Sequence, residues 1–182
     1  MIGAFDLKAE DGWIIQGLAK AGPKVQEDGV LAVGGWDYWA VISKKEFENF
    51  ILRFDIQYDS KGNSGVLFHT PNKEIYKSCF EIQLEAGDDP KIKDDKHKSG
   101  AIFDFVAPQK NPAKPIGEWN SVEIRYEAPK LWVTINGEVV QDGVDISKIE
   151  GLKHKLTKGR IAFQRNDFKK AVYLKNIRVK RL

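Results

Sequence analysis

The 182-residue chain contains one cysteine and no long hydrophobic run, and both shortages exclude classes of protein. A single cysteine allows no internal disulfide framework. Cys79 lies in an apolar alternation, where a small buried hydrophobe is expected rather than a nucleophile. No stretch approaches about 18 apolar residues, and the N-terminal segment lacks the basic and apolar regions of a signal peptide. We expect no membrane span and a soluble chain, either cytoplasmic or the mature form of a secreted or periplasmic protein.

An excess of charge of one sign is also missing. The chain carries 29 basic and 26 acidic residues, a formal net charge of +3, with no basic stripe, so nucleic acid is not an expected partner. Ser-His-Asp, Walker-type and dinucleotide motifs are absent, which argues against acyl transfer, nucleotide hydrolysis and cofactor-dependent redox chemistry. No linker rich in Ser, Gly or Pro divides the sequence, so residues 1–182 are predicted to form a single β-sandwich domain.

The segment from Gly117 to Val140 shows what kind of structure fills that domain. Its apolar residues recur at every second position over 122–126 and again over 131–135, and Asn136-Gly137, the residue pair that a type I′ hairpin turn favours, follows the second run. A proline-containing segment, 127–130, is the expected turn of the preceding hairpin. Three consecutive antiparallel strands are predicted here.

The same alternation recurs along the chain and predicts the fold class. Further strands are expected over 29–33, 39–42, 50–58, 66–69, 79–85, 100–106, 160–164 and 171–181, and 43–48 is a candidate for one short helix. About ten to twelve short strands with many turns are typical of two packed antiparallel sheets. We predict an all-β, two-sheet antiparallel jelly-roll sandwich whose concave sheet holds the ligand.

Polar side chains in strand centres are the first candidates for a ligand site. Glu81 and Gln83 share one strand face, where a carboxylate and an amide can bind a sugar hydroxyl, hold a metal or work as acid and base. The alternative is that this face is simply wetted, and Glu85 on the same face fits that equally. Arg53 and Asp55 share a face of another strand, where they either extend the same polar patch or form a structural network.

Two tryptophans and a lysine near predicted turns extend the set of candidates. Trp36 and Trp39 suit sugar stacking, because an indole covers the apolar face of a pyranose while its N–H donates to a hydroxyl. Structural packing is the competing interpretation. Lys114 would reach an oxyanion, unless it is simply solvated.

Six segments occur in an order and spacing that point to a known family: 62–69 (GNSGVLFH), 80–84 (FEIQL), 97–108 (HKSGAIFDFVAP), 114–120 (KPIGEWN), the Asn136-Gly137 hairpin, and 161–182, which begins IAFQ and ends VYLKNIRVKRL. In these segments the chain resembles the 3-keto-disaccharide hydrolase domain family, which has a concanavalin A-like lectin/glucanase fold. The resemblance implies a carbohydrate partner, a disaccharide or glycoside whose C3 hydroxyl is oxidised to a ketone. The implied function is that of a carbohydrate-active hydrolase or lyase. A non-catalytic glycan-binding module of the same fold is the alternative.

The resemblance completes the predicted site. His69, His97 and Gln164 fall within its motifs, although the family commonly carries Arg at position 69 and a His-Gly turn after Gln164. Neutral imidazole suits proton transfer near pH 7 and metal ligation, but each histidine fits a loop equally well. No HExxH-like spacing exists, so a divalent metal is left open and no other cofactor is expected. The predicted catalytic residues are Glu81, His69 and His97; the predicted substrate-binding residues are Gln83, Asp55, Arg53, Trp36, Trp39, Lys114 and Gln164.

Overall fold

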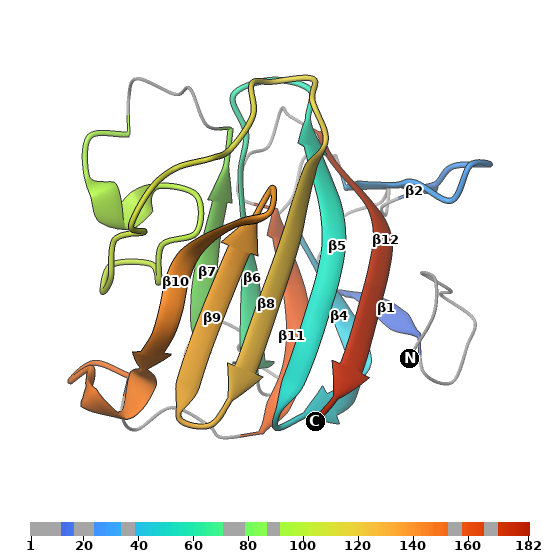
Figure 1. Ribbon diagram of the computed structural model, residues 1–182. Helices are drawn as coiled ribbons and strands as arrows, with labels where there is room; N and C mark the ends of the chain where they lie inside the picture. Colours follow the sequence, from blue (N-terminus) through green and yellow to red (C-terminus); the bar gives the residue numbers. More distant parts are fainter. Residues whose placement is uncertain are drawn as a thin grey trace.

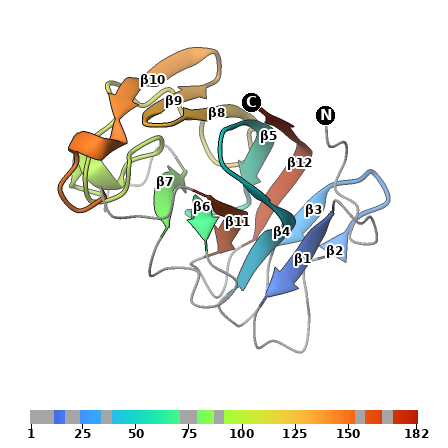
Figure 2. The same ribbon diagram turned by 90° about the horizontal axis from the view of Figure 1, so that it is seen from below.

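Two antiparallel sheets contain all the strands of the computed structural model, which describes residues 12–16, 24–33, 39–70, 79–86, 92–152, 158–165 and 171–182. The sheets pack face to face (Figure 1), and the view along the strands shows them as two layers (Figure 2). This arrangement confirms the all-β, two-sheet jelly-roll sandwich.

The strand order places sequence-distant segments side by side. One sheet has five strands in the order β1-β4-β11-β6-β7, namely Trp13–Gln16, Trp39–Phe47, Gly159–Arg165, Asn63–Thr70 and Phe80–Glu85. The other has seven in the order β10-β9-β8-β5-β12-β3-β2, namely Glu138–Asp145, Lys130–Ile135, Asn120–Glu127, Phe50–Tyr58, Val172–Arg181, Leu31–Val33 and Lys24–Val25.

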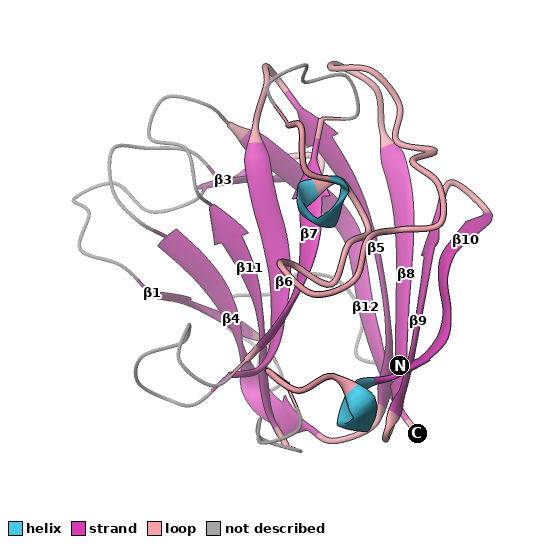
Figure 3. Ribbon diagram, turned by 90° about the vertical axis from the view of Figure 1, so that its left-hand side faces the viewer, coloured by secondary structure: helices cyan, strands magenta, loops and turns pink. Residues whose placement is uncertain are grey.

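Helix is scarce in the part of the chain that the structure describes. Two short 3₁₀ helices, η1 (Asp95–His97) and η2 (Ile146–Lys148), lie in the connections and are drawn in cyan in Figure 3. No helix among the described residues is long and apolar enough to cross a membrane.

Alternating side chains place one face of each sheet in the core between the sheets. In β5 every second side chain, from Phe50 to Tyr58, is at most 2% exposed, because it points between the sheets. The inward side chains of β7 join the same core, where Ile82 is fully buried. The core therefore fills the space between the sheets, and the intervening positions project onto the two outer faces, where a ligand has access.

The predicted hairpins are confirmed. Asn136 and Gly137 have φ angles of 51° and 81°, the left-handed pair of a type I′ turn. Glu127 pairs with Lys130 across the turn that joins β8 to β9. The 117–140 segment therefore forms consecutive antiparallel strands, as its alternation predicted.

Two predicted elements are wrong. The helix over 43–48 does not form, because β4 continues through Phe47 and pairs with β11 over this stretch. The predicted strand over 100–106 is instead a tight turn, which is closed by an isolated β-bridge between Ile102 and Val106. Asp104 within it has a φ of 66°, a left-handed value that an extended strand does not tolerate.

Candidate active site

Glu81 lies on the outer face of the five-stranded sheet, beside its edge. The register of β7 sends Phe80 and Ile82 into the core, so Glu81 points the opposite way. Its carboxyl group opens into a pocket of about 240 Å³. Apart from Glu81 and Asp104 the lining is mostly apolar, and it comprises Leu67, Cys79, Ile102, Phe103, Phe105 and Leu152. Cys79 is buried in a small apolar cluster here, as the sequence predicted.

Gly65 on the neighbouring strand makes room for the Glu81 side chain. A Cβ atom at position 65 would overlap the Glu81 carboxylate, which lies directly over the glycine. Glycine in a strand interior weakens the strand and often marks a close approach. The position of the Glu81 carboxylate therefore explains why residue 65 is a glycine.

The segment from Gly100 to Phe103 holds the other wall of the pocket against β7. Gln83 N–H donates to Ala101 O at 3.0 Å, and Gly100 N–H donates to Gln83 O at 2.8 Å. Phe103 N–H donates to Glu81 O at 3.0 Å. These bonds fix the turn beside Glu81.

Asp104, which lines this pocket, makes a close contact with His97. His97 Nε2 lies 2.6 Å from Asp104 Oδ1. The His97 ring also stacks on Phe103, with 4.7 Å between ring centroids and an interplanar angle of 19°. Both contacts orient an imidazole whose side chain remains 39% exposed, so it is accessible to a ligand.

The surroundings of Glu81 change its acidity. Burial, the larger cause, and the negative charge of Asp104 together raise the pKa of the Glu81 carboxyl from 4.5 to about 7. A carboxyl group with such a pKa is present in both protonation states near neutral pH. Proton transfer in either direction is therefore available at this position.

Two buried amides lie beside Glu81 on the same outer face. Gly65 pairs with Gln83 on one side and with Gln164 on the other, so three adjacent strands present Gln, Gly and Gln in one row. Neither polar atom of the Gln83 amide, nor Oε1 of Gln164, has a hydrogen-bond partner in the described part of the chain. Buried polar atoms normally have partners, so these amide atoms still have the capacity for a further hydrogen bond.

His69, in contrast, lies on the inner face of the same sheet. Its φ of 59° interrupts the alternation that would otherwise place it beside Leu67 on the outer face. The ring is fully buried, with Phe68 and Tyr126 at 5.3 and 5.0 Å between centroids. Its Nε2 lies 3.0 Å from Glu48 O. His97 therefore contacts two residues that line the Glu81 pocket, Phe103 and Asp104, whereas His69 lies on the other face of the sheet.

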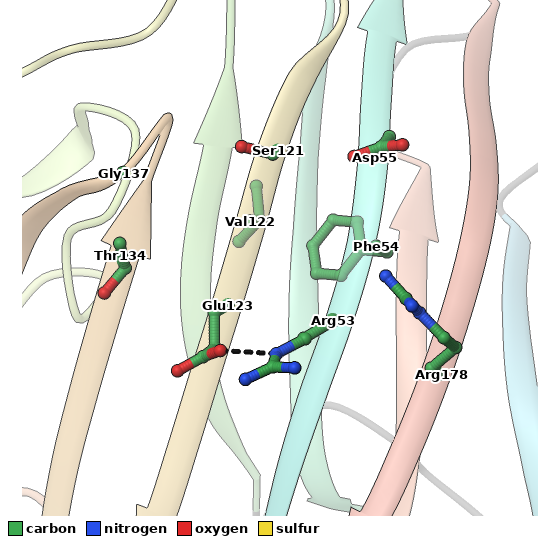
Figure 4. A pocket seen from close by; sticks show the side chains of 9 residues that line it. All are labelled: Arg53, Phe54, Asp55, Ser121, Val122, Glu123, Thr134, Gly137 and Arg178. Atoms are coloured by element: carbon green, nitrogen blue, oxygen red, sulfur yellow. Dashed lines mark hydrogen bonds and ion pairs between the residues drawn. The ribbon is translucent and has the colours of Figure 1, made fainter. Parts of the chain in front are cut away.

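The remaining predicted residues lie away from Glu81 or outside the described residues. Arg53 and Asp55 project from the outer face of the seven-stranded sheet (Figure 4), so they do not extend the polar patch of Glu81. Lys114 is exposed, and its backbone N–H donates to Asn120 Oδ1 at 2.7 Å. Trp36 and the side chain of Trp39 are outside the described residues.

The described residues do not fit a metal ion. No three side chains of His, Cys, Asp or Glu among them are grouped closely enough to hold one.

Asp104 was not predicted as a site residue, because the surrounding apolar residues read as a strand. The signal that would have found it is the Gly100 that starts this segment, whose φ is 87°.

The described residues thus form a two-sheet β-sandwich with a titratable carboxyl group and two buried amides on the outer face of one sheet. Comparison with known proteins gives the particular family. The chain belongs to the 3-keto-alpha-glucoside-1,2-lyase-like domain family, whose model matches residues 2–180. The family predicted from the six sequence segments is thereby confirmed.

Individual relatives agree with this assignment. A curated 3-keto-disaccharide hydrolase from Bacteroides thetaiotaomicron is 29% identical over 145 residues, which cover 66% of this chain and 50% of that protein. The chain thus spans half the length of this relative. A crystal structure of a candidate glycosyl hydrolase from Parabacteroides distasonis superposes with a TM-score of 0.80 at 23% identity, covering 94% of this chain and all of that one. Carbohydrate binding module CBM66 from Bacillus subtilis shares the fold, with a TM-score of 0.60 at 12% identity over 93% and 96% of the two chains.

Proposed function

We propose that this protein cleaves 3-keto-glycosides by elimination and hydration, with Glu81 as the base. One observation carries the proposal: a carboxyl group with a pKa of about 7 lines a pocket of about 240 Å³ in a member of this family. A ketone at C3 acidifies the C2 proton, so a carboxylate of this basicity is matched to removing it near neutral pH.

The reaction follows from the chemistry of the ketone. The Glu81 carboxylate takes the C2 proton, the electron pair of that C–H bond forms a C1–C2 double bond, and the C1–O bond breaks. The departing oxygen takes a proton from protonated His97, whose ring is oriented by Asp104 and Phe103. Water then adds across the double bond, with its hydroxyl on C1 and its proton on C2. The net reaction is hydrolysis of the glycosidic bond.

The amide row would position the sugar during these steps. Gln83 and Gln164 offer donor and acceptor atoms that are already desolvated and have no hydrogen-bond partner. A bond to a ring hydroxyl therefore forms without breaking a hydrogen bond within the protein.

Turnover of two substrates tests the proposal. We expect Glu81→Gln to lower the release of p-nitrophenol from p-nitrophenyl 3-keto-glucoside by about 10²–10⁴-fold, the usual contribution of a general base. The matched control is Glu118→Gln, an exposed carboxylate in a loop, which should retain parental turnover. His97→Asn should impair 3-keto-trehalose cleavage more than p-nitrophenol release, because p-nitrophenolate leaves without a proton. Full turnover in the Glu81→Gln protein would refute the assignment.

The second candidate is a glycan-binding module without turnover. It is favoured by the likeness in fold to a carbohydrate binding module and by the two amides, which can hold a sugar without chemistry. Calorimetric binding of unoxidised disaccharides, together with the absence of turnover for both keto-sugars, would support it. Turnover of either keto-sugar would exclude it.

A further inference from the structure

The outer face of the seven-stranded sheet carries a second, cationic site, which we call the β5-β12 face and define by Ile51, Arg53, Arg178 and Lys180. These four residues line a pocket of about 220 Å³. Arg178 stands directly opposite Arg53 in the β5-β12 register, and Lys180 stands opposite Ile51. Three cations are therefore gathered on two adjacent strands.

This arrangement breaks a rule of strand pairing. Like charges directly opposite each other in antiparallel strands destabilise the pair. Arg53 is partly compensated, because its Nε donates to Glu123 Oε2 at 2.5 Å. In the parts of the chain that the structure describes, no acidic side chain pairs with Arg178 or Lys180. Local conflicts of this kind are expected at functional positions, where a ligand supplies the missing opposite charge.

Polar groups suited to hydroxyls adjoin these cations. A second pocket of about 240 Å³ shares Arg53 and Arg178 and continues to Asp55, Ser121 and Thr134. In Figure 4 the Arg178 side chain extends from β12 toward β5, on the same face as the Arg53–Glu123 pair. Asp55 Oδ2 accepts a hydrogen bond from Asn176 Nδ2 at 2.6 Å, which holds that carboxylate in place. Anion-binding and hydroxyl-binding groups thus lie side by side.

We propose that the β5-β12 face binds an acidic saccharide, with a uronate carboxylate on Arg178 and Lys180 and the sugar hydroxyls on Asp55, Ser121 and Thr134. Planar guanidinium groups match carboxylates through paired hydrogen bonds. The two carboxylates of the adjoining pocket, Asp55 and Glu123, accept bonds from hydroxyls but repel a polyphosphate, which favours a sugar acid over nucleic acid. The face lies on the opposite sheet from Glu81, so this binding is independent of the proposed catalysis.

Calorimetry with a matched pair of ligands tests this site. Digalacturonate is titrated against its dimethyl ester, which has the same skeleton without charge. We expect digalacturonate to bind at least about tenfold more tightly than the ester, and the difference to shrink at high salt, because exposed charges are screened. The double variant Arg178→Ala/Lys180→Ala should weaken digalacturonate binding by about tenfold or more. The affinity of Arg178→Lys for digalacturonate should lie between those of the parent and the double variant.

The control is Arg125→Ala, which removes a cation from the same sheet face where it already pairs with Glu127. It should bind digalacturonate within about twofold of the parent. Equal affinities for acid and ester, no measurable binding of digalacturonate, or an unaffected double variant would overturn the proposal. Tighter binding of a short oligonucleotide would overturn it as well, by assigning the face to phosphate. Glu81→Gln should leave this binding unchanged, which separates the outcome from that of the proposed catalysis.

Discussion

His97 Nε2 and Asp104 Oδ1 are 2.6 Å apart, and Asp104 reaches this position from a left-handed backbone with a φ of 66°. The same carboxylate raises the pKa of Glu81 through its negative charge. One strained residue therefore acts on both proposed catalytic groups, since it orients the imidazole and makes the neighbouring carboxyl group more basic. Backbone conformations of this kind persist where surrounding structure enforces them, often at functional sites.

Replacing Asp104 by Asn should shift the pH dependence of turnover. Asn tolerates left-handed backbone, so the turn should remain intact. Loss of the negative charge lowers the pKa of Glu81, and the acidic limb of the kcat/KM profile should move to lower pH. Because burial is the larger cause, only part of the elevation should be lost. An unchanged acidic limb in an otherwise folded variant would show that another group controls it.

Glu81→Gln should change stability in a pH-dependent way. The folded state keeps a proton on Glu81 up to a pKa of about 7, whereas the unfolded chain releases it near 4.5. The parent therefore loses stability as pH rises through this window, and the variant does not. We expect equal unfolding free energies at pH 4 and a variant that is more stable by about 1–3 kcal/mol at pH 8. Urea denaturation at both pH values measures this. A variant less stable than the parent at pH 8 would place Glu81 in a structural network.

Gly65→Ala should damage the site more than the fold. The added methyl group occupies the position of the Glu81 carboxylate, whose flexible side chain can move away. We expect stability within about 1 kcal/mol of the parent, since Ala fits a strand at least as well as Gly. Turnover of 3-keto-glucoside should fall by about tenfold or more, because the base is displaced from its position. Parental turnover with a normal melting curve would contradict the location of the base.

Ile82→Ala tests the register of β7 on which the whole site depends. Ile82 is fully buried between the sheets, so its truncation should cost roughly 2–5 kcal/mol of unfolding free energy. Ile82→Val should cost about 0.5–1.5 kcal/mol. Ser121→Ala, at an exposed position, is the control for the denaturation series. If Ile82→Ala melted like the parent, the alternation in β7 would be assigned to the wrong faces.

Alternation of apolar and polar residues made the sheets predictable from sequence, since it indicates which side chains of β5 and β7 point between the sheets. The shared strand face of Glu81 and Gln83 was predicted in this way. His69 was misplaced because a single left-handed residue reverses the facing of a side chain, and tertiary context selects that conformation. Asp104 was missed because its apolar neighbours suggested a strand. The segment forms a turn instead, which hydrogen bonds to β7 stabilise. Of the two alternatives for Arg53 and Asp55, the structural network fits, because strand order, which alternation does not reveal, places them on the other sheet and in hydrogen bonds with Glu123 and Asn176.

The hydrogen bonds from the 100–103 segment to β7 also prevent the edge of the sheet from pairing with another chain. β7 is the last strand of its sheet, and its outer backbone groups would otherwise offer a template for pairing with another chain. Gly100, Ala101 and Phe103 occupy those groups. Substitutions that detach this segment would therefore expose an open sheet edge and promote aggregation. Selection against aggregation and selection for an ordered pocket would then act on the same few backbone contacts.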